Sequence, residues 1–224
     1  MNANPSRRAR ILKIAQFSIL LAIEAITCFT ILGSLPITPT IVATLSMIPV
    51  IITSILLDWK YGTLMGFVTG IFSLIVWTFM PPGPAAFVFT PFVKPGNFFS
   101  LVICLVPRTL TGTFSGLIYQ GILKALHAKK YKYPLGISIA AAVGSLTNTI
   151  LVLLGIYLFF GKPYAEAYGM SYEALLGAIG VVIGTNGVAE LITSIIISNS
   201  FCNKLSFFMP SNCSCNIFYI FSCI

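Results

Sequence analysis

Five polar or charged side chains lie inside long apolar segments of the sequence. They are Glu24, Arg108, Asn148, Asn186 and Glu190. If those segments cross a bilayer, such groups are expected to face the interior of a helix bundle, pair with one another or line a ligand site. Their chemistry suits a small polar ligand, because a guanidinium binds anionic groups and side-chain amides bind hydroxyls or amides.

Arg108 lies near the middle of "LVICLVPRTLTGTFSGLIYQ", residues 101–120. Two interpretations remain open from the sequence. In one, Arg108 pairs with Glu190; in the other, its planar fork binds the carboxylate or another anionic group of a small ligand. Pro107 removes a backbone donor and frees a carbonyl one turn earlier, which places another polar group at the same depth.

The other polar positions lie on two later segments. "GTNGVAELI" places Asn186 and Glu190 one turn apart on one helix face, and "GSLTNTIL" places Thr147 and Asn148 mid-segment. The asparagines either contact a ligand or bridge helices, and the nearby aromatic residues either wall a pocket or form an interfacial belt. The predicted substrate-binding residues are Arg108, Asn148, Asn186, Glu190, Thr147, Trp77 and Phe89.

Composition indicates the environment of these segments. The chain is 57% hydrophobic and 8% charged, with a mean hydropathy of +0.97, whereas a soluble domain is roughly a quarter charged. The apolar runs are continuous rather than alternating, which favours helices over a barrel. The net charge of +8 is spread over short segments between those runs, which is typical of membrane flanks and not of a nucleic-acid surface.

We therefore predict an all-α integral membrane protein with six transmembrane helices in one domain, residues 1–200. The expected helices are about 11–35, 41–57, 61–80, 98–126, 135–160 and 173–200. An N-terminus in the cytoplasm places ten Lys and Arg residues inside and two outside, so both termini are predicted to be cytoplasmic. The inside set is Arg7, Arg8, Arg10, Lys13, Lys60, Lys124, Lys129, Lys130, Lys132 and Lys204, and the outside set is Lys94 and Lys162.

Two segments depart from the helical pattern. Residues 81–97, "PPGPAAFVFTPFVKPGN", form an outer connection rich in proline and phenylalanine, which either folds back over the bundle as a lid or anchors at the interface. Residues 201–224 form an atypical tail with four of the six cysteines. We interpret the tail as weakly structured, and sequence alone does not decide whether it is native or frame-altered.

Small residues at helical spacing predict where helices pack closely. Glycines recur every fourth residue at 62, 66 and 70, at 112 and 116, and at 180 and 184, which predicts packing inside the bundle. On the first helix a narrow row of small residues either packs internally or docks another membrane protein. This docking stripe consists of Ala15, Ser18, Ala22 and Ala25.

The sequence lacks the motifs that several classes of function require. The sequence holds no Gly-Lys-Ser/Thr phosphate loop, and its one histidine, His127, falls in an inner basic loop. No His-based metal or acid–base centre is therefore expected within the membrane. We predict that the chain is not an enzyme and holds neither a metal nor a cofactor.

Several motifs together resemble a known family. They are "ATLSMIPVIITSILLDWKYGTLMGFVTGIFSLIVWTF", "FVFTPF", "LVPRTLTG", "GSLTNTILVLLGIYLFF" and "TNGVAELI". With the six predicted spans and the small-residue row, they resemble the S components, the substrate-binding membrane subunits of energy-coupling-factor (ECF) vitamin transporters. The resemblance covers about residues 10–200, and the patterns "IPVII", "KYG" and "PFVKPGN…VPRTLTG" look most like the pantothenate-type branch.

The resemblance implies a subunit of an ATP-driven importer in the bacterial cytoplasmic membrane. Such a subunit captures a vitamin outside, and a transmembrane coupling subunit and two cytoplasmic ATPases, which use the ATP, complete the transporter. The family's docking motif is Ala-xxx-Ala, for which this chain has Ser18 and Ala22. Other micronutrients, such as folate, riboflavin or cobalamin, and a ligand-free membrane scaffold are the alternatives.

Overall fold

The structure is a computed structural model that describes residues 5–30, 35–38, 41–43, 46–81, 83, 85–125 and 132–207. Most of the predicted tail 201–224, with Cys213, Cys215 and Cys223, lies outside the described residues, as does the side chain of Cys202. Cys28 and Cys104, the thiols predicted to lie in apolar helices, are free and buried.

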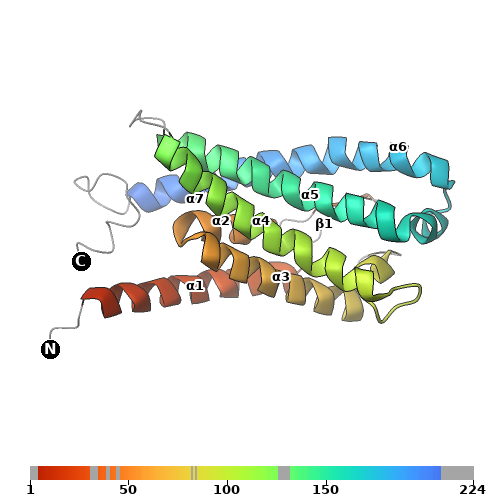
Figure 1. Ribbon diagram of the computed structural model, residues 1–224, viewed down its shortest axis with the longest axis horizontal. Coiled ribbons are helices and arrows are strands. Elements are labelled where there is room, and N and C mark those ends of the chain that lie inside the picture. The colour runs from red at the N-terminus through yellow and green to blue at the C-terminus, as the bar shows by residue number, and fades with distance from the viewer. Residues whose placement is uncertain are drawn as a thin grey trace.

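The described chain is a bundle of long helices that run along one axis (Figure 1). Its elements are α1 Pro5–Phe29, β1 Leu35–Thr38, β2 Ile41–Ala43, α2 Met47–Leu56, α3 Trp59–Phe79, the 3-10 turn η2 Ala86–Val88, α4 Phe98–Ala125, α5 Lys132–Ala167, α6 Tyr172–Val182, the π-helical turn η3 Ile183–Gly187 and α7 Val188–Phe207. Elements α6, η3 and α7 follow one another without a break. Five of the resulting helices are long and apolar enough to cross a membrane.

The second predicted span, 41–57, differs from the structure. Residues 35–38 and 41–43 pair as an antiparallel two-stranded hairpin, and the helix begins only at Met47. The first helix likewise ends at Phe29 and not near residue 35. The ten residues of α2 span about 15 Å, half of a bilayer core, so α2 cannot cross alone. Its residues are nevertheless almost all buried, because neighbouring helices surround it.

Helices α3 and α4 match their predicted ranges within two residues, whereas α5 ends at Ala167 and α7 at Phe207, each seven residues beyond the predicted end. Local chemistry explains several of these boundaries. Asp58 caps α3 by accepting a hydrogen bond from the Trp59 amide at 2.7 Å. The backbone leaves helical geometry at Phe160 (φ −130°, ψ 16°), where the fifth span was predicted to end. Gly169, at φ +65°, ends α5 in a Schellman turn, with the Met170 amide bonded to the Ala165 carbonyl at 2.9 Å.

Glycines bring α3 and α4 into direct backbone contact, as predicted. A Cβ atom at Gly66 would overlap the Arg108 carbonyl, and one at Gly112 would overlap the Gly62 carbonyl. The Ser54 hydroxyl of α2 donates to that same Gly112 carbonyl at 2.6 Å, so three helices meet there. This antiparallel contact is hereafter called the glycine seam, and it fixes the depth of Arg108 against α3.

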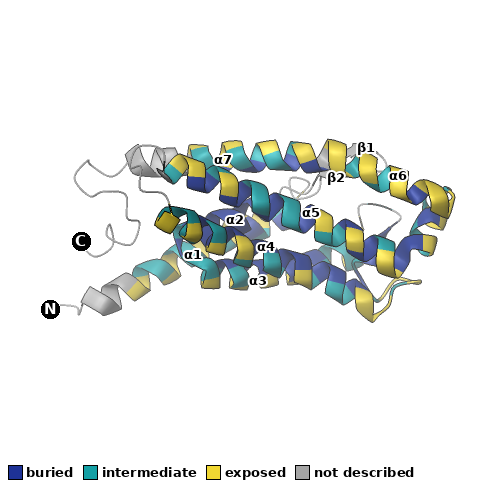
Figure 2. Ribbon diagram, turned by 45° about the horizontal axis from the view of Figure 1, so that its top comes forward, coloured by how far each residue is buried: buried dark blue, intermediate teal, exposed yellow. Residues whose placement is uncertain are grey.

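The predicted packing of Gly180 and Gly184 is wrong. A Cβ atom at either position would meet nothing within 4 Å among the described residues. Most of α6 is exposed, and Leu175 is its one buried residue (Figure 2). Glycine spacing therefore located a close helix contact on α3 and α4 and not on α6, because no described element lies within 4 Å of Gly180 or Gly184.

Helix α1 begins and α7 ends at the same end of the bundle (Figure 1). Exposed apolar side chains cover the outward faces of the helices, as expected for surfaces that face lipid (Figure 2). The cytoplasmic placement of both ends stays a prediction from the Lys and Arg distribution.

The glycine seam predicts a paired result within α4. Gly112→Ala should destabilise the protein by about 1–3 kcal/mol, because the added methyl group must push α3 away. Gly121→Ala, where a Cβ meets nothing within 4 Å, should leave stability unchanged or slightly raised. Thermal unfolding in detergent measures both, and equal effects would show that the seam is not tightly packed.

Candidate functional site

Arg108 is held at its depth by the carbonyl that Pro107 frees. Pro107 has no amide hydrogen, so the Ile103 carbonyl, four residues earlier, lacks its usual helical donor. The Arg108 Nη1 donates to that carbonyl at 3.1 Å. Arg108 is 4% exposed, about 15 Å along α4 from its start at Phe98. The guanidinium thus supplies the donor that Pro107 cannot give to the Ile103 carbonyl, and that carbonyl accepts from one of the guanidinium N–H groups.

Aromatic residues of the outer connection cover the guanidinium. The Arg108 Cζ lies 5.3 Å from the centre of the Phe89 ring, within the range of a cation–π interaction. The Trp77 ring lies 4.5 Å from the Phe89 ring on the other side. The structure therefore brings Trp77, Phe89 and Arg108 into one layered cluster, whose role in substrate binding stays a prediction.

The register of α4 against α5 places Asn148 opposite Arg108. The Thr111 hydroxyl lies 3.4 Å from the Gly144 carbonyl, and a Cβ at Gly155 would lie 2.8 Å from Ile103. Between these two points, antiparallel helices bring Arg108 to the level of Asn148. Asn148 is 5% exposed. Within the described residues, its Oδ1 and the Arg108 Nε have no hydrogen-bond partner. Two buried polar atoms from facing helices therefore lack partners at one depth.

The predicted pair of Arg108 with Glu190 is not formed. Among the described residues, Arg108 contacts the Ile103 carbonyl and the Phe89 ring. The buried Glu190 accepts a hydrogen bond from the Thr149 hydroxyl at 3.0 Å. Thr147, the threonine among the predicted binding residues, is half-buried on another face of α5. Thr149, two positions later, is thus one partner of Glu190.

The last helix changes its winding beside this cluster. Asn186 lies in the π-helical turn η3, and its side chain lies outside the described residues. A Cβ at Gly187 would lie 3.6 Å from the methyl group of Thr149, the residue that bonds Glu190. The turn η3 therefore packs against α5 at this point. Strand β2 lies against η3. Turns of this kind occur often at functional sites, because they break the regular hydrogen-bond ladder.

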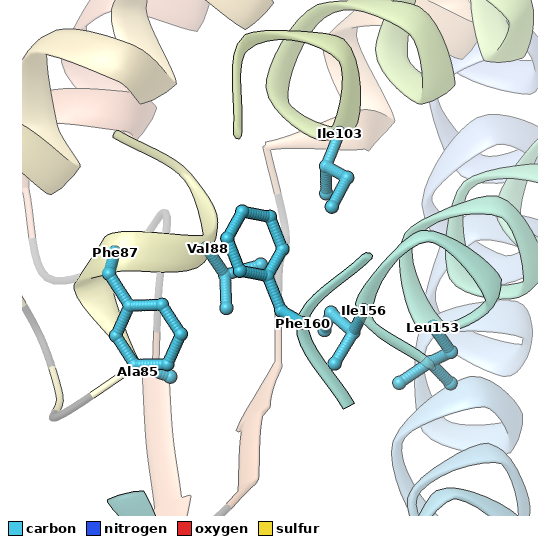
Figure 3. Packing of buried hydrophobic residues seen from close by; sticks show 7 residues of the cluster. All are labelled: Ala85, Phe87, Val88, Ile103, Leu153, Ile156 and Phe160. Carbon is cyan, nitrogen blue, oxygen red and sulfur yellow. The ribbon is translucent and has the colours of Figure 1, made fainter. Parts of the chain in front are cut away.

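The outer connection folds back into the bundle, as one of its two predicted forms requires. Phe87 and Val88 are buried against Ile103 and Phe160, and the Phe87 and Phe160 rings meet edge to face at 5.9 Å (Figure 3). The Ser100 hydroxyl donates to the Phe87 carbonyl at 2.7 Å. Phe92, in the same connection, is 75% exposed and does not join this packing. A role as a movable lid stays a prediction.

A cavity of about 200 Å³ opens beyond this cluster, between α5 and α6. Its lining is mostly apolar and includes Leu153, Ile156, Tyr164, Tyr168 and Val182. Leu153 and Ile156 lie on α5 one and two turns beyond Thr149 and Asn148, and both belong to the hydrophobic cluster of Figure 3. None of the predicted binding residues lines the cavity. Its volume is below the roughly 300–1,000 Å³ typical of drug-sized ligands.

Glu24, which was not among the predicted binding residues, is fully buried at 0% exposed. Its Oε1 accepts a hydrogen bond from the Cys28 thiol at 3.1 Å. The four-residue spacing of Glu24 and Cys28 is visible in the sequence. In the described part of the chain, no cluster of three or more His, Cys, Asp or Glu residues could hold a metal ion.

The docking stripe lies on the opposite side of α1 from Glu24. Ala15, Ser18 and Ala22 are exposed, and Ala25 is half-buried. The Ser18 hydroxyl donates to the Ile14 carbonyl at 3.0 Å, so the serine adds no unpaired polar group to this face. Of the two predicted arrangements, internal packing does not apply to these three exposed residues. The face is available to lipid or to another protein.

Two comparisons with known proteins bear on this arrangement. The sequence profile of the family described as "ECF transporter, substrate-specific component" matches residues 12–199. The "Pantothenic acid transporter PanT" of Lactococcus lactis subsp. cremoris (strain MG1363) is 33% identical over 189 residues, which cover 82% of this chain and 86% of that protein. The family match ends before the atypical tail.

The Thr149–Glu190 bond yields a second prediction. Thr149→Val should destabilise the protein by about 0.5–1.5 kcal/mol, because a buried carboxylate loses one donor. Thr193→Val is the control on α7, since that hydroxyl bonds only the Ala189 carbonyl of its own helix in the structure. Thermal unfolding of both variants measures the difference. If Thr193→Val costs as much as Thr149→Val, the interhelical bond contributes nothing measurable.

Proposed function

This chain belongs to the family of ECF transporter substrate-specific components, and from that premise we propose that it binds pantothenate for uptake into the cell. The family consists of transporter components and not of enzymes. The name of the Lactococcus lactis relative supports pantothenate as the substrate. Pantothenate is an anion that carries an amide and hydroxyl groups, so its chemistry can be compared directly with the polar groups of the candidate site.

The unpaired Nε of Arg108 is the observation that carries the proposal. This buried cation has one partner at the Ile103 carbonyl and a second donor without one in the described chain. A ligand carboxylate would supply the missing acceptor and neutralise the charge. Asn148, opposite, would accept a hydrogen bond from a ligand amide or hydroxyl through its unpaired Oδ1.

The remaining predicted residues take roles around this pair. Trp77 and Phe89 would close the apolar side of the ligand, and the cavity beside Leu153 and Ile156 would receive its aliphatic part. Glu190, Asn186 and Thr147 stay candidates for further polar contacts. The site would open toward the outer connection of residues 81–97, with both chain ends in the cytoplasm.

We also propose that the docking stripe binds a transmembrane coupling subunit. The exposed faces of Ala15, Ser18 and Ala22 allow a second helix to approach closely, where dispersion drives association in a membrane. Two cytoplasmic ATPases on that subunit would supply the energy, so this chain itself would need no cofactor.

Vitamin binding to the purified protein tests the substrate. Pantothenate should raise the melting temperature, and a panel of folate, riboflavin and cobalamin should not. Arg108→Gln should weaken pantothenate binding at least tenfold, or about 1.4 kcal/mol, because the counter-charge is lost. Lys124→Gln, in the last turn of the same helix, should leave the affinity unchanged.

Two results would contradict the proposal. Stabilisation by another vitamin and not by pantothenate would reassign the substrate. Stabilisation by none, with the protein folded, would favour a scaffold without a ligand. Unchanged pantothenate affinity in Arg108→Gln would remove the counter-charge role from Arg108 and leave the substrate assignment intact.

A larger side chain within the docking stripe tests its role in binding the coupling subunit. Ala22→Leu should reduce co-purification with the coupling subunit and ATPases while pantothenate binding stays unchanged, because the substitution lies on the face of α1 away from Glu24. Leu154→Phe, on an exposed part of α5, is the control for added volume at a lipid-facing position. If both variants assemble normally, the partner docks elsewhere.

A further inference from the structure

A vitamin that binds at Arg108 from outside must pass the outer end of the bundle, where two segments could give way. They are the outer connection, residues 81–97, and helix α6, and both lie at the end away from the two termini (Figure 1). The two segments differ in how firmly they are packed, so their contacts indicate which one moves.

The outer connection is tied to the helices on both of its sides. Thr90 is fully buried, and its hydroxyl lies 2.7 Å from the Thr78 hydroxyl of α3. On the α4 side, the Ser100 hydroxyl donates to the Phe87 carbonyl at 2.7 Å. A Cβ atom at Gly96 would overlap the Thr90 carbonyl, so the connection also folds tightly on itself. Movement of this segment would leave buried polar groups without partners, which is costly.

Helix α6, in contrast, packs loosely against the bundle. Leu175 is its one buried residue. The cavity of about 200 Å³ lies between α6 and α5, and α6 contributes Ala178, Ile179 and Val182 to its lining. Side chains beside such a space lose part of their dispersion contacts, and segments with few buried apolar contacts open at low free-energy cost.

Both ends of α6 have features of a hinge. Gly169, at φ +65°, ends α5, and the Ser171 hydroxyl then accepts a hydrogen bond from the Ala174 amide at 3.4 Å, so α6 begins as a separate helix. At its other end, the π-helical turn η3 joins α6 to α7 and packs against Thr149 through Gly187. Hinges are a few residues at element ends that absorb changes of φ and ψ. Helix α6 can therefore turn as one body while η3 stays on α5.

Apolar contacts near the outer end hold α6 against α5. The Tyr172 ring stacks on the Tyr157 ring of α5, with the ring centres 6.0 Å apart and the planes 13° from parallel. A Cβ atom at Gly161 would lie 2.7 Å from the Tyr172 ring and 3.5 Å from the Leu175 side chain. Contacts between these apolar surfaces separate and form again without breaking a hydrogen bond to the rest of the bundle.

We propose that α6 is the gate of the vitamin site. It turns away from α5 about the Gly169 turn and η3, and pantothenate passes between the two helices while the outer connection stays in place. Leu153, which lines the cavity, lies one turn from Thr149 and its neighbour Asn148, so the opened space leads toward the polar level of the site. This inference rests on the proposed function, since it presumes that pantothenate binds at that level.

A reversible link between α5 and α6 tests the gate in the full chain, purified in detergent. Tyr157→Cys and Tyr172→Cys, in a chain whose four tail cysteines are replaced by serine, are joined by a short bis-methanethiosulfonate linker, which a reductant cleaves. Compared with the same protein before linking, the link should slow both association and dissociation of radiolabelled pantothenate at least tenfold. The affinity should stay within threefold, and reduction should restore both rates.

The matched control fixes the outer connection instead. Thr78→Cys and Thr90→Cys replace the two hydroxyls that lie 2.7 Å apart, and oxidation joins them as a disulfide. Both rates should stay within twofold of those of the reduced protein, because the outer connection does not move when the vitamin enters.

Leu175→Ala is a further variant, which weakens closure without a link. Loss of the one buried side chain of α6 should raise both rate constants at least threefold. Gly177→Ala, where a Cβ meets nothing within 4 Å, should change neither. These rates decide the question if a cysteine pair does not fold.

Unchanged rates in the linked α5–α6 protein, or in a folded Leu175→Ala protein, would overturn the inference. Slower association in the Thr78–Thr90 disulfide would overturn it as well, because the outer connection would then be the gate. A loss of affinity in the linked protein without slower association would show that the link distorts the site and would also contradict the gate. A wild-type chain that binds no pantothenate would overturn the proposed function and this inference together.

Discussion

The structure depends on the cost of a guanidinium buried in a membrane helix. Arg108 is tolerated because Pro107 leaves the Ile103 carbonyl without its helical donor, and the guanidinium takes that donor's place. One carbonyl cannot satisfy five N–H donors. The Phe89 ring lies over the guanidinium, and the Nε donor stays without a partner in the described chain, so the site is compensated only in part. A ligand that brings a carboxylate completes it.

The glycine seam holds this site at a fixed depth. Because α3 and α4 touch through their backbones, Arg108 cannot slide relative to Gly66 without a steric clash. The contacts of Thr111 and Ile103 with α5 fix Asn148 opposite in the same way. Helix α1 carries Glu24 on its inner face and the docking stripe on its outer face.

Much of the fold followed from the sequence because long apolar segments have few stable forms in a bilayer. The spans of α3, α4 and α5, the inward folding of the outer connection and the α3–α4 glycine contact were all predictable. The start of the second span was not, because Ile41–Ala43 pair with Leu35–Thr38 as a strand where hydropathy alone indicates a helix. The predicted packing at Gly180 and Gly184 was wrong for a related reason. The spacing of glycines shows where a helix is narrow, but it does not show which helix lies opposite.

The site was predictable in its residue types and less so in its pairings. Arg108, Trp77 and Phe89 come together, and the register of α4 and α5 puts Asn148 at the depth of Arg108. Thr149 and not Thr147 bonds Glu190, because a shift of two positions on a helix turns a side chain to another face.

An experimental structure of the pantothenate-bound protein tests the central claim most directly. The account predicts the ligand carboxylate within hydrogen-bonding distance of the Arg108 Nε, with Nη1 still on the Ile103 carbonyl and Asn148 on a polar group of the ligand. A carboxylate bound elsewhere, with Arg108 paired to Glu190 or Glu24 alone, would contradict it.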